Sequence, residues 1–340
     1  MCNKSIGIIL KGYFPYVTLT HKFGAMRTVK PERLKKGDTI AIISPASPLL
    51  TVEHYKKGKK ILEKMGYRVI ASKYVHNRHL LFAGDARTRA QNINDVFSDT
   101  SVQAIMCVRG GSGTSHILPF VNFSIIQKNP KIFIGYSDIT ALQIAIFNKT
   151  GLVTFYGPMM ATDIGKGFTS YKMEQLLKVI TEAREPFELK NPSKKRIQTI
   201  YPGEAKGKLM GGCLSIVAAS LGTGYEIDTR DKILFFEDID EKPHRIDRYL
   251  TQLIQAKKFE GVNGIIFGTF HRCNYTKKDT YYRFGVTMLD IIRERITPLA
   301  IPSIYGLQFG HVVNKLTIPQ GVNATLNASE GCLFIEPAVI

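Results

Sequence analysis

The residues of this chain whose types suit catalysis are Ser137, Glu237 and His311, each of which stands beside an apolar segment. Unassisted serine is a poor nucleophile at neutral pH and needs a base to accept its proton. Imidazole suits that role because its pKa lies near 6.5, and a carboxylate can fix its tautomer and stabilise the cation that it becomes. The order serine, glutamate, histidine along the chain is compatible with nucleophilic catalysis, although triads occur in several orders.

Ser137 stands where a predicted buried strand turns into a helix. The short apolar run 131–134 is typical of an inner strand, Gly135 permits a tight turn, and Asp138 can cap the helix that follows. Such a corner lifts a hydroxyl out of the sheet and points helix N–H groups at the group it attacks, as in a nucleophile elbow. The segment lacks the second glycine of the G-x-S-x-G pattern, so a serine that only caps a helix is the alternative.

Glu237, His311 and the glycine-rich segment 109–113 each have a structural interpretation beside the catalytic one. Glu237 could pair with Arg245 or Arg248, and His311 could be a hydrogen-bonded loop residue. The segment 109–113 follows a predicted strand but lacks the spacing of a phosphate loop. Its bare backbone N–H groups could equally stabilise an oxyanion. Because ligands gather beyond the carboxyl ends of the strands in open α/β sheets, we expect the site at that edge.

The other histidines and the cysteines predict neither a metal site nor disulfides. His244 and His271 are more plausible as residues that line a site than as metal ligands, because no histidine pair has ligand spacing. The five cysteines are odd in number, scattered and without a C-x-x-C pair, which favours reduced thiols in a cytosol. We therefore expect a cytoplasmic protein without a bound metal.

The formal net charge of +18 invites a nucleic-acid interpretation, but the lysines are dispersed along the chain. No basic stripe interleaves with aromatic residues, and no helix-turn-helix, RRM or zinc-finger pattern is present. Solubility and attraction to polyanionic ligands also explain a basic surface. We therefore do not expect nucleic-acid binding to be the main function. No apolar run reaches about 18 residues, so we do not expect membrane insertion either. Residues 1–25 are predicted to be an extension, either poorly ordered or not translated if synthesis starts at Met26.

Strand-like and helix-like segments alternate along the chain, which predicts an α/β fold with a parallel sheet between helices. A stretch rich in prolines and charges interrupts the alternation and fits an interdomain connection with short edge strands. We therefore expect an N-terminal α/β domain (26–185), a linker (186–206) and a C-terminal α/β domain (207–340). The predicted strands are 39–44, 67–71, 104–108, 132–135, 232–236, 264–268, 304–307 and 317–318, and the predicted helices are 52–65, 87–97, from the elbow to 151, 211–221, 245–257 and 287–295.

The chain resembles the LD-carboxypeptidase family of serine peptidases, the group of muramoyltetrapeptide carboxypeptidases and microcin-immunity peptidases. The resemblance covers residues 31–321 in family order, which makes it specific where a single motif would not be. The matching segments are LKKGDTIAIISPASP (34–48), RGGSG (109–113), IGYSDITAL (134–142), TGLVTFYGPM (150–159), GGCLSIVAASLGTGYE (211–226), ILFFEDIDEKPHRIDRYLTQL (233–253) and GLQFGH with LTIPQG (306–321).

By this resemblance the fold is two α/β domains with the active site at their interface, the N-terminal sheet being mostly parallel and flanked by helices. The family's nucleophile corresponds to Ser137, its base to His311 and its orienting glutamate to Glu237. The backbone N–H groups that hold the oxyanion correspond to Gly110, Gly111 and Asp138. The side chains expected to line the substrate cleft are Arg109 and His244.

The reaction implied by the resemblance is hydrolysis of an L–D amide bond, which releases terminal D-alanine from a muropeptide tetrapeptide in cell-wall recycling. It needs no metal or organic cofactor, and the implied assembly is a homodimer. Two alternatives stay open: a microcin-immunity-type peptidase that cleaves a peptide–nucleotide or other modified peptide, and a non-catalytic polyanion-binding protein. Two positions depart from the family pattern, because Cys213 replaces the usual asparagine and His244 the usual aromatic residue.

Overall fold

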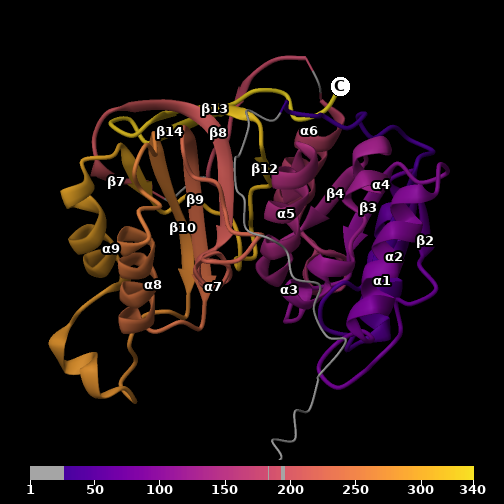
Figure 1. Cartoon of the computed structure of the whole chain (residues 1–340), viewed down its shortest axis with the longest axis horizontal. Coiled ribbons are helices and arrows are strands. Elements are labelled where there is room, and N and C mark those ends of the chain that lie inside the picture. The colour runs from indigo at the N-terminus through magenta and orange to yellow at the C-terminus, as the bar shows by residue number, and fades with distance from the viewer. Residues whose placement is uncertain (1–26, 183, 193–195) are drawn as a thin grey trace, which may run out of the picture.

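The structure is a computed structural model that describes residues 27–340 except 183 and 193–195. Two α/β units lie side by side, the N-terminal one in indigo and magenta and the C-terminal one mostly in orange and yellow (Figure 1). This arrangement confirms the predicted α/β architecture. The predicted extension, residues 1–25, lies outside the described residues. In the described part of the chain, no helix is both long and apolar enough to cross a bilayer.

The N-terminal unit is built on a six-stranded sheet with the order β12-β5-β4-β3-β1-β2. All neighbouring strands are parallel except β12 and β5. The expectation of a mostly parallel sheet is therefore confirmed. The strands β1, β3, β4 and β5 are buried along their whole length, which explains their continuous apolar runs. The bounds are β1 (Thr39–Ile43), β2 (Arg68–Ala71), β3 (Ala104–Cys107), β4 (Ile132–Gly135), β5 (Thr154–Tyr156), β12 (Ile318–Gln320), α1 (Val52–Lys64), α2 (Ala86–Ser98), α3 (Thr114–Ile117), α4 (Phe123–Lys128), α5 (Thr140–Thr150) and α6 (Ser170–Thr181).

The C-terminal unit is built on an eight-stranded mixed sheet with the order β6-β14-β13-β8-β9-β10-β11-β7. The central strands from β8 to β11 are parallel, and the remaining pairs are antiparallel. The edge strands β6 and β7 come from the stretch predicted to be a connection with short edge strands. The bounds are β6 (Phe187–Glu188), β7 (Gln198–Tyr201), β8 (Glu204–Cys213), β9 (Lys232–Ile239), β10 (Gly264–His271), β11 (Ser303–Tyr305), β13 (Asn323–Asn327), β14 (Cys332–Ile335), α7 (Leu214–Ala219), α8 (Pro243–Gln255) and α9 (Met288–Ile296).

Among the predicted boundaries that are wrong in the C-terminal unit, two bear on the site. The helix predicted to open at Gly211 begins only at Leu214, and residues 211–213 end strand β8. Gly211 has a φ of +154°, and a Cβ at this position would lie 1.9 Å from the carbonyl oxygen of Phe235. Glycine therefore permits a close approach to β9 here rather than the start of a helix. β9 continues to Ile239, so Glu237 lies within the strand instead of after it.

The last part of the chain ties the two units together. Strand β11 belongs to the C-terminal sheet, whereas β12 pairs with β5 of the N-terminal sheet, and β13 returns to pair with β8. The loop between β11 and β12 carries His311. Because this loop crosses from one sheet to the other, its side chains can reach groups of both units.

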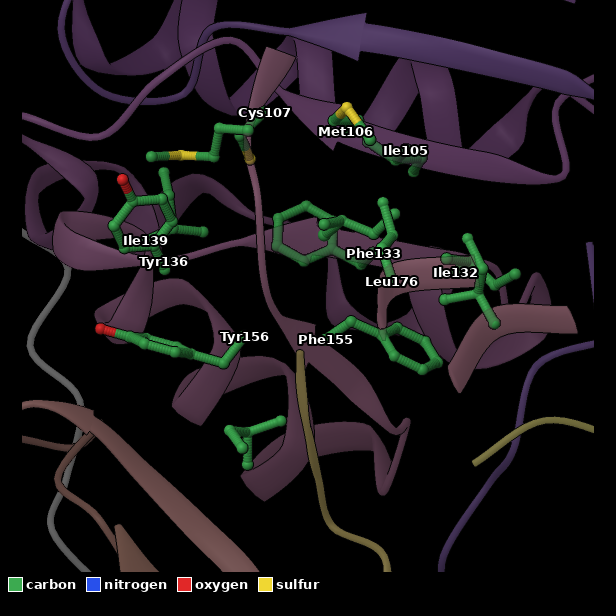
Figure 2. Packing of buried hydrophobic residues seen from close by; sticks show 14 of the residues in the cluster. Ile105, Met106, Cys107, Ile132, Phe133, Tyr136, Ile139, Phe155, Tyr156 and Leu176 are labelled. Carbon is green, nitrogen blue, oxygen red and sulfur yellow. The ribbon is translucent and has the colours of Figure 1, made fainter. Parts of the chain in front are cut away.

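The core of the N-terminal unit ends at two tyrosines, Tyr136 and Tyr156. Figure 2 shows both at one end of the cluster that contains Phe133 and Phe155, with their hydroxyl oxygens directed away from these phenylalanines. Only 6% of Tyr136 and 1% of Tyr156 is exposed. Since a buried tyrosine hydroxyl needs a hydrogen-bond partner, both hydroxyls must be satisfied by polar groups near the junction of the units.

Candidate active site

Ser137, His311 and Glu237 form a continuous hydrogen-bonded chain at the junction of the two units. The Nε2 atom of His311 lies 3.0 Å from the Oγ of Ser137. The Nδ1 atom lies 2.8 Å from the Oε2 of Glu237, and the same oxygen accepts the backbone N–H of His311 at 3.1 Å. The fold thus brings together three residues that the sequence singled out, although Ser137 and His311 are 174 positions apart.

Ser137 occupies a sharp corner between β4 and the short turn Ser137–Ile139, with a φ of +66°. This left-handed conformation is unfavourable for a residue with a Cβ, so the surrounding fold must hold it. The Ser137 N–H donates to the hydroxyl of Tyr156 at 3.2 Å. A Cβ on Gly110 would lie 2.9 Å from the Cβ of Ser137, so the glycine-rich turn packs directly against the corner. Backbone N–H groups of an oxyanion hole would have to lie beside the serine in this way.

The predicted capping role of Asp138 is wrong. The helix after the corner has no side-chain cap, and the Asp138 carboxylate instead accepts the backbone N–H of Thr114 at 2.9 Å. The Thr114 hydroxyl donates in turn to the Asp138 carbonyl. Asp138 is buried, and burial raises the pKa of its carboxyl. The side chain therefore fastens α3, which follows the glycine-rich turn, to the elbow.

Arg89 supports the same region and was not identified from the sequence. Its buried guanidinium donates to the carbonyls of Pro45, Gly84 and Gly113, at 2.6, 3.0 and 2.8 Å respectively. These carbonyls belong to three separate loops, which one side chain thus holds together. The sequence carries no signal for this role, because only the fold brings the three carbonyls to one arginine.

Glu237 and His311 shift each other's pKa. Glu237 is fully buried, which disfavours its charge, but the charge and hydrogen bonds of His311 outweigh burial and lower the pKa of the carboxyl. Burial likewise disfavours a charged His311, yet Glu237 outweighs this effect and raises the pKa of the imidazole above its usual value. Glu237 therefore stays ionised at neutral pH, as a carboxylate must to stabilise an imidazolium beside it.

Among the residues that the structure describes, neither Arg245 nor Arg248 forms an ion pair with Glu237. Its second oxygen accepts the Tyr156 hydroxyl at 2.6 Å, and Arg245 pairs with Glu241 instead. Gly310 has a φ of +81°, and a Cβ there would lie 2.2 Å from the Glu237 carboxylate. Only glycine fits this position, so that the chain can pass close over the carboxylate. Tyr156 was not identified from the sequence, yet its hydroxyl links Glu237 to the backbone of the elbow.

Cys213, which departs from the family pattern, lies near the Glu237 carboxylate. Its Sγ donates to the Oδ1 of Asp238 at 3.4 Å, and its backbone N–H donates to the hydroxyl of Thr140 at 3.1 Å. Burial, together with the charges of Asp238 and Glu237, raises the pKa of the thiol. Burial and the charge of Glu237 also raise the pKa of Asp238 to about 6. Cys213 is therefore a protonated, weak hydrogen-bond donor at neutral pH and no nucleophile.

Arg109 and His244, expected to line the cleft, lie in different surroundings. Arg109 directly precedes the glycine-rich turn that packs against Ser137. It is half-buried, and its Nε has no partner in the part of the chain that the structure describes. Burial lowers the pKa of this guanidinium. His244 instead lies 3.0 Å from the Tyr275 hydroxyl and beside Tyr281, on an exposed segment. The structure thus brings Arg109 toward the triad and joins His244 to an aromatic cluster.

The chemistry that this arrangement offers is activation of a serine hydroxyl by an imidazole. Within residues 27–340, leaving aside 183 and 193–195, no three His, Cys, Asp or Glu side chains converge as ligands for a metal ion. The cysteines among them are free thiols.

Comparison with known proteins decides the family. The family model of the LD-carboxypeptidase N-terminal domain matches residues 40–157, and that of the C-terminal domain matches residues 206–326. The chain belongs to the LD-carboxypeptidase family. As an LD-carboxypeptidase family member it is a carboxypeptidase-type hydrolase, which confirms the family resemblance noted in the sequence.

Relatives of this LD-carboxypeptidase family member carry two kinds of name. It is 38% identical to a probable murein peptide carboxypeptidase of Bacillus subtilis, over 91% of this chain and 95% of the relative. It is 28% identical to the microcin C7 self-immunity protein MccF of Escherichia coli, over 86% and 92%. A muramoyltetrapeptide carboxypeptidase of Oxalobacter formigenes has a TM-score of 0.78 at 28% identity, over 89% and 100%. An MccF-like protein of Bacillus anthracis has a TM-score of 0.80 at 31% identity, over 90% and 99%.

Proposed function

We propose that this chain is a serine-type LD-carboxypeptidase that hydrolyses the L–D amide bond of muropeptide tetrapeptides and releases terminal D-alanine. The observation that carries the proposal is the hydrogen-bonded chain from Ser137 through His311 to Glu237, in a family whose relatives include a murein peptide carboxypeptidase. In this proposal the N-terminal domain (26–185) supplies the nucleophile, and the C-terminal domain (207–340) supplies the base and the carboxylate that orients it.

In the proposed mechanism, the Oγ of Ser137 attacks the scissile carbonyl while the Nε2 of His311 accepts its proton. Glu237 holds the Nδ1–H tautomer and stabilises the imidazolium. The backbone N–H groups of Gly110, Gly111 and Asp138 hold the developing oxyanion. His311 then passes its proton to the leaving amine, the C–N bond breaks, and D-alanine leaves. Water, deprotonated by His311, hydrolyses the acyl-enzyme and restores the serine.

A second candidate is a microcin-immunity-type peptidase that cleaves a peptide–nucleotide, which the similarity to MccF supports. The third, a non-catalytic polyanion-binding protein, rests on the net charge of +18 alone and leaves the hydrogen-bonded triad without a purpose. We also propose a cytoplasmic homodimer without nucleic-acid partners, in which the basic surface helps to capture carboxylate-rich muropeptides. Incubation with muramoyl tetrapeptide, followed by mass spectrometry, tests the first proposal through the loss of one alanine.

The configuration of the terminal residue is expected to change the rate strongly. A D-residue and an L-residue place their carboxylate and methyl group differently around the scissile carbonyl, and misplacement by about 1 Å can cost about 10²-fold. We expect a tetrapeptide that ends in D-alanine to have a kcat/KM at least about 10²-fold above that of its L-alanine epimer, with pentapeptide a poor substrate. Equal kcat/KM values for the two epimers would identify a general peptidase or esterase and refute the LD-specific function.

The pH dependence of kcat/KM is expected to report the raised pKa of His311. The imidazole must be neutral to accept the Ser137 proton, so activity rises with pH through a midpoint above 6.5. Glu237→Gln removes the carboxylate that raises this pKa, and the remaining activity should have its midpoint at lower pH. Asp238→Asn removes a smaller charge effect on His311 and should lower the midpoint less than Glu237→Gln does. A midpoint that follows Asp238 rather than Glu237 contradicts the assignment of the base.

A further inference from the structure

A cavity of about 740 Å³ lies beside His311 at the junction of the two units. The N-terminal unit contributes Tyr136 and Lys166 to its wall, and the C-terminal unit contributes Ile239 and His271. This volume lies within the range of small-molecule sites, roughly 300–1,000 Å³. Because His311 borders the cavity, a molecule in it would lie next to the imidazole.

Positive charge dominates this cavity. Lys172 and Lys315 approach the one carboxylate of Asp163 at 4.0 and 2.5 Å, and all three side chains are buried. Burial disfavours a charged Asp163, but Lys315 outweighs burial and lowers the pKa of the carboxyl. Two ammonium groups thus share one carboxylate, and the cluster keeps a net positive charge in a medium that screens it weakly. The exposed Lys166 adds a further ammonium group to the cavity wall.

The proposed roles of Ser137 and His311 decide which part of the substrate lies next to these lysines. In acyl transfer by a serine triad, the histidine gives its proton to the leaving nitrogen. The leaving group must therefore lie on the His311 side of Ser137. The ring of Tyr136 packs edge-on against His311 at 5.0 Å between centroids, and the ammonium of Lys315 lies 3.9 Å from that ring's centroid. A leaving group beside His311 is consequently close to the lysine cluster.

We propose that this cavity is the subsite for the leaving group, and that Lys166 together with the Lys172–Asp163–Lys315 cluster binds an anionic group attached to the leaving nitrogen. The inference rests on the proposed function, because it assigns the leaving side from the roles of Ser137 and His311. The anion is a carboxylate if the leaving group is an amino acid and a phosphoryl group if it is a nucleotide. In both cases the subsite recognises the negative charge of the leaving group rather than the methyl group of alanine.

The test compares the tetrapeptide acid with its C-terminal amide, which lacks the negative charge. The wild-type kcat/KM is expected to be roughly 10- to 100-fold higher for the acid, as for other charge-assisted contacts. Lys166→Glu places a negative charge in the cavity wall and should lower the acid-to-amide ratio at least about tenfold. Because Lys166 is exposed, the variant is expected to fold.

Lys128→Glu is the matched control. Lys128 is an exposed lysine at the end of α4, before β4 begins, and therefore at the opposite edge of the sheet from Ser137. It should keep the wild-type ratio. A Lys166→Glu ratio equal to that of wild type and Lys128→Glu overturns the subsite but leaves the carboxypeptidase function intact.

Binding separates the subsite from catalysis. Calorimetry on Ser137→Ala protein should give a lower Kd for the acid than for the amide, and introducing Lys166→Glu should remove this preference; equal Kd values overturn the subsite. If wild type cleaves neither peptide, the proposed function fails, while this binding difference still tests the subsite. Competition by D-alanine and by adenosine monophosphate identifies the source of the anion. Inhibition by either one that Lys166→Glu weakens supports the subsite, whereas inhibition by neither contradicts it.

Discussion

Ser137→Ala is expected to lower kcat about 10⁶-fold, the typical cost of losing a triad serine. The substitution removes only the hydroxyl group, whose oxygen lies within hydrogen-bond distance, 3.0 Å, of the Nε2 of His311. Alanine keeps the Cβ and hence the same left-handed backbone at φ +66°, so the free energy of unfolding should stay within about 0.5 kcal/mol of wild type. Single-turnover kinetics on muramoyl tetrapeptide and thermal unfolding measure the two quantities.

A fluorophosphonate probe gives an independent control for the same residue. Wild-type protein should be labelled at Ser137, and the alanine variant should not be labelled. A variant that keeps a tenth of wild-type activity would remove Ser137 from the role of nucleophile. Absence of labelling in wild type, together with salt-sensitive binding of nucleic acid, would favour the polyanion-binding alternative.

Glu237→Gln is expected to lower kcat by about 10⁴-fold, as when the carboxylate of another serine triad is neutralised. The Oε2 atom of Glu237 accepts two N–H groups of His311, and the Oε1 atom accepts the Tyr156 hydroxyl. Glutamine can keep its carbonyl toward His311, but its amide then faces a hydroxyl that has lost its acceptor. One buried group left unsatisfied costs about 1–3 kcal/mol of stability.

Tyr156→Phe is the matched variant for this prediction. It removes the same tyrosine–carboxylate hydrogen bond, together with the acceptor of the Ser137 N–H, but leaves the charge of Glu237 next to His311. Its loss of stability should resemble that of Glu237→Gln, while its loss of kcat should be much smaller. If Glu237→Gln keeps a near-normal kcat and loses only stability, Glu237 is a structural residue and the triad is refuted.

Most local elements and the candidate reactive residues could be predicted from the amino-acid sequence alone. Residues 132–135 are predicted as a strand and form β4, because a short apolar run with β-branched residues and a glycine at its end favours a buried strand. Ser137, Glu237 and His311 were found from their chemistry and from the family pattern. Local rules failed at Asp138, because a capping pattern cannot show that a better partner, Thr114, arrives from another segment.

How these elements meet could be seen only in the folded protein. The sequence places His311 in a loop, but the pairing of β12 with β5 carries that loop across the junction to Ser137. The packing of the two units likewise brings the Tyr156 hydroxyl to Glu237 and the ammonium group of Lys315 to Asp163. None of these contacts has a periodic signature, since each joins residues far apart in the chain. They follow from the docking of the two units, in which β8 of one lies against α5 and β12 of the other, and local propensity does not encode this docking.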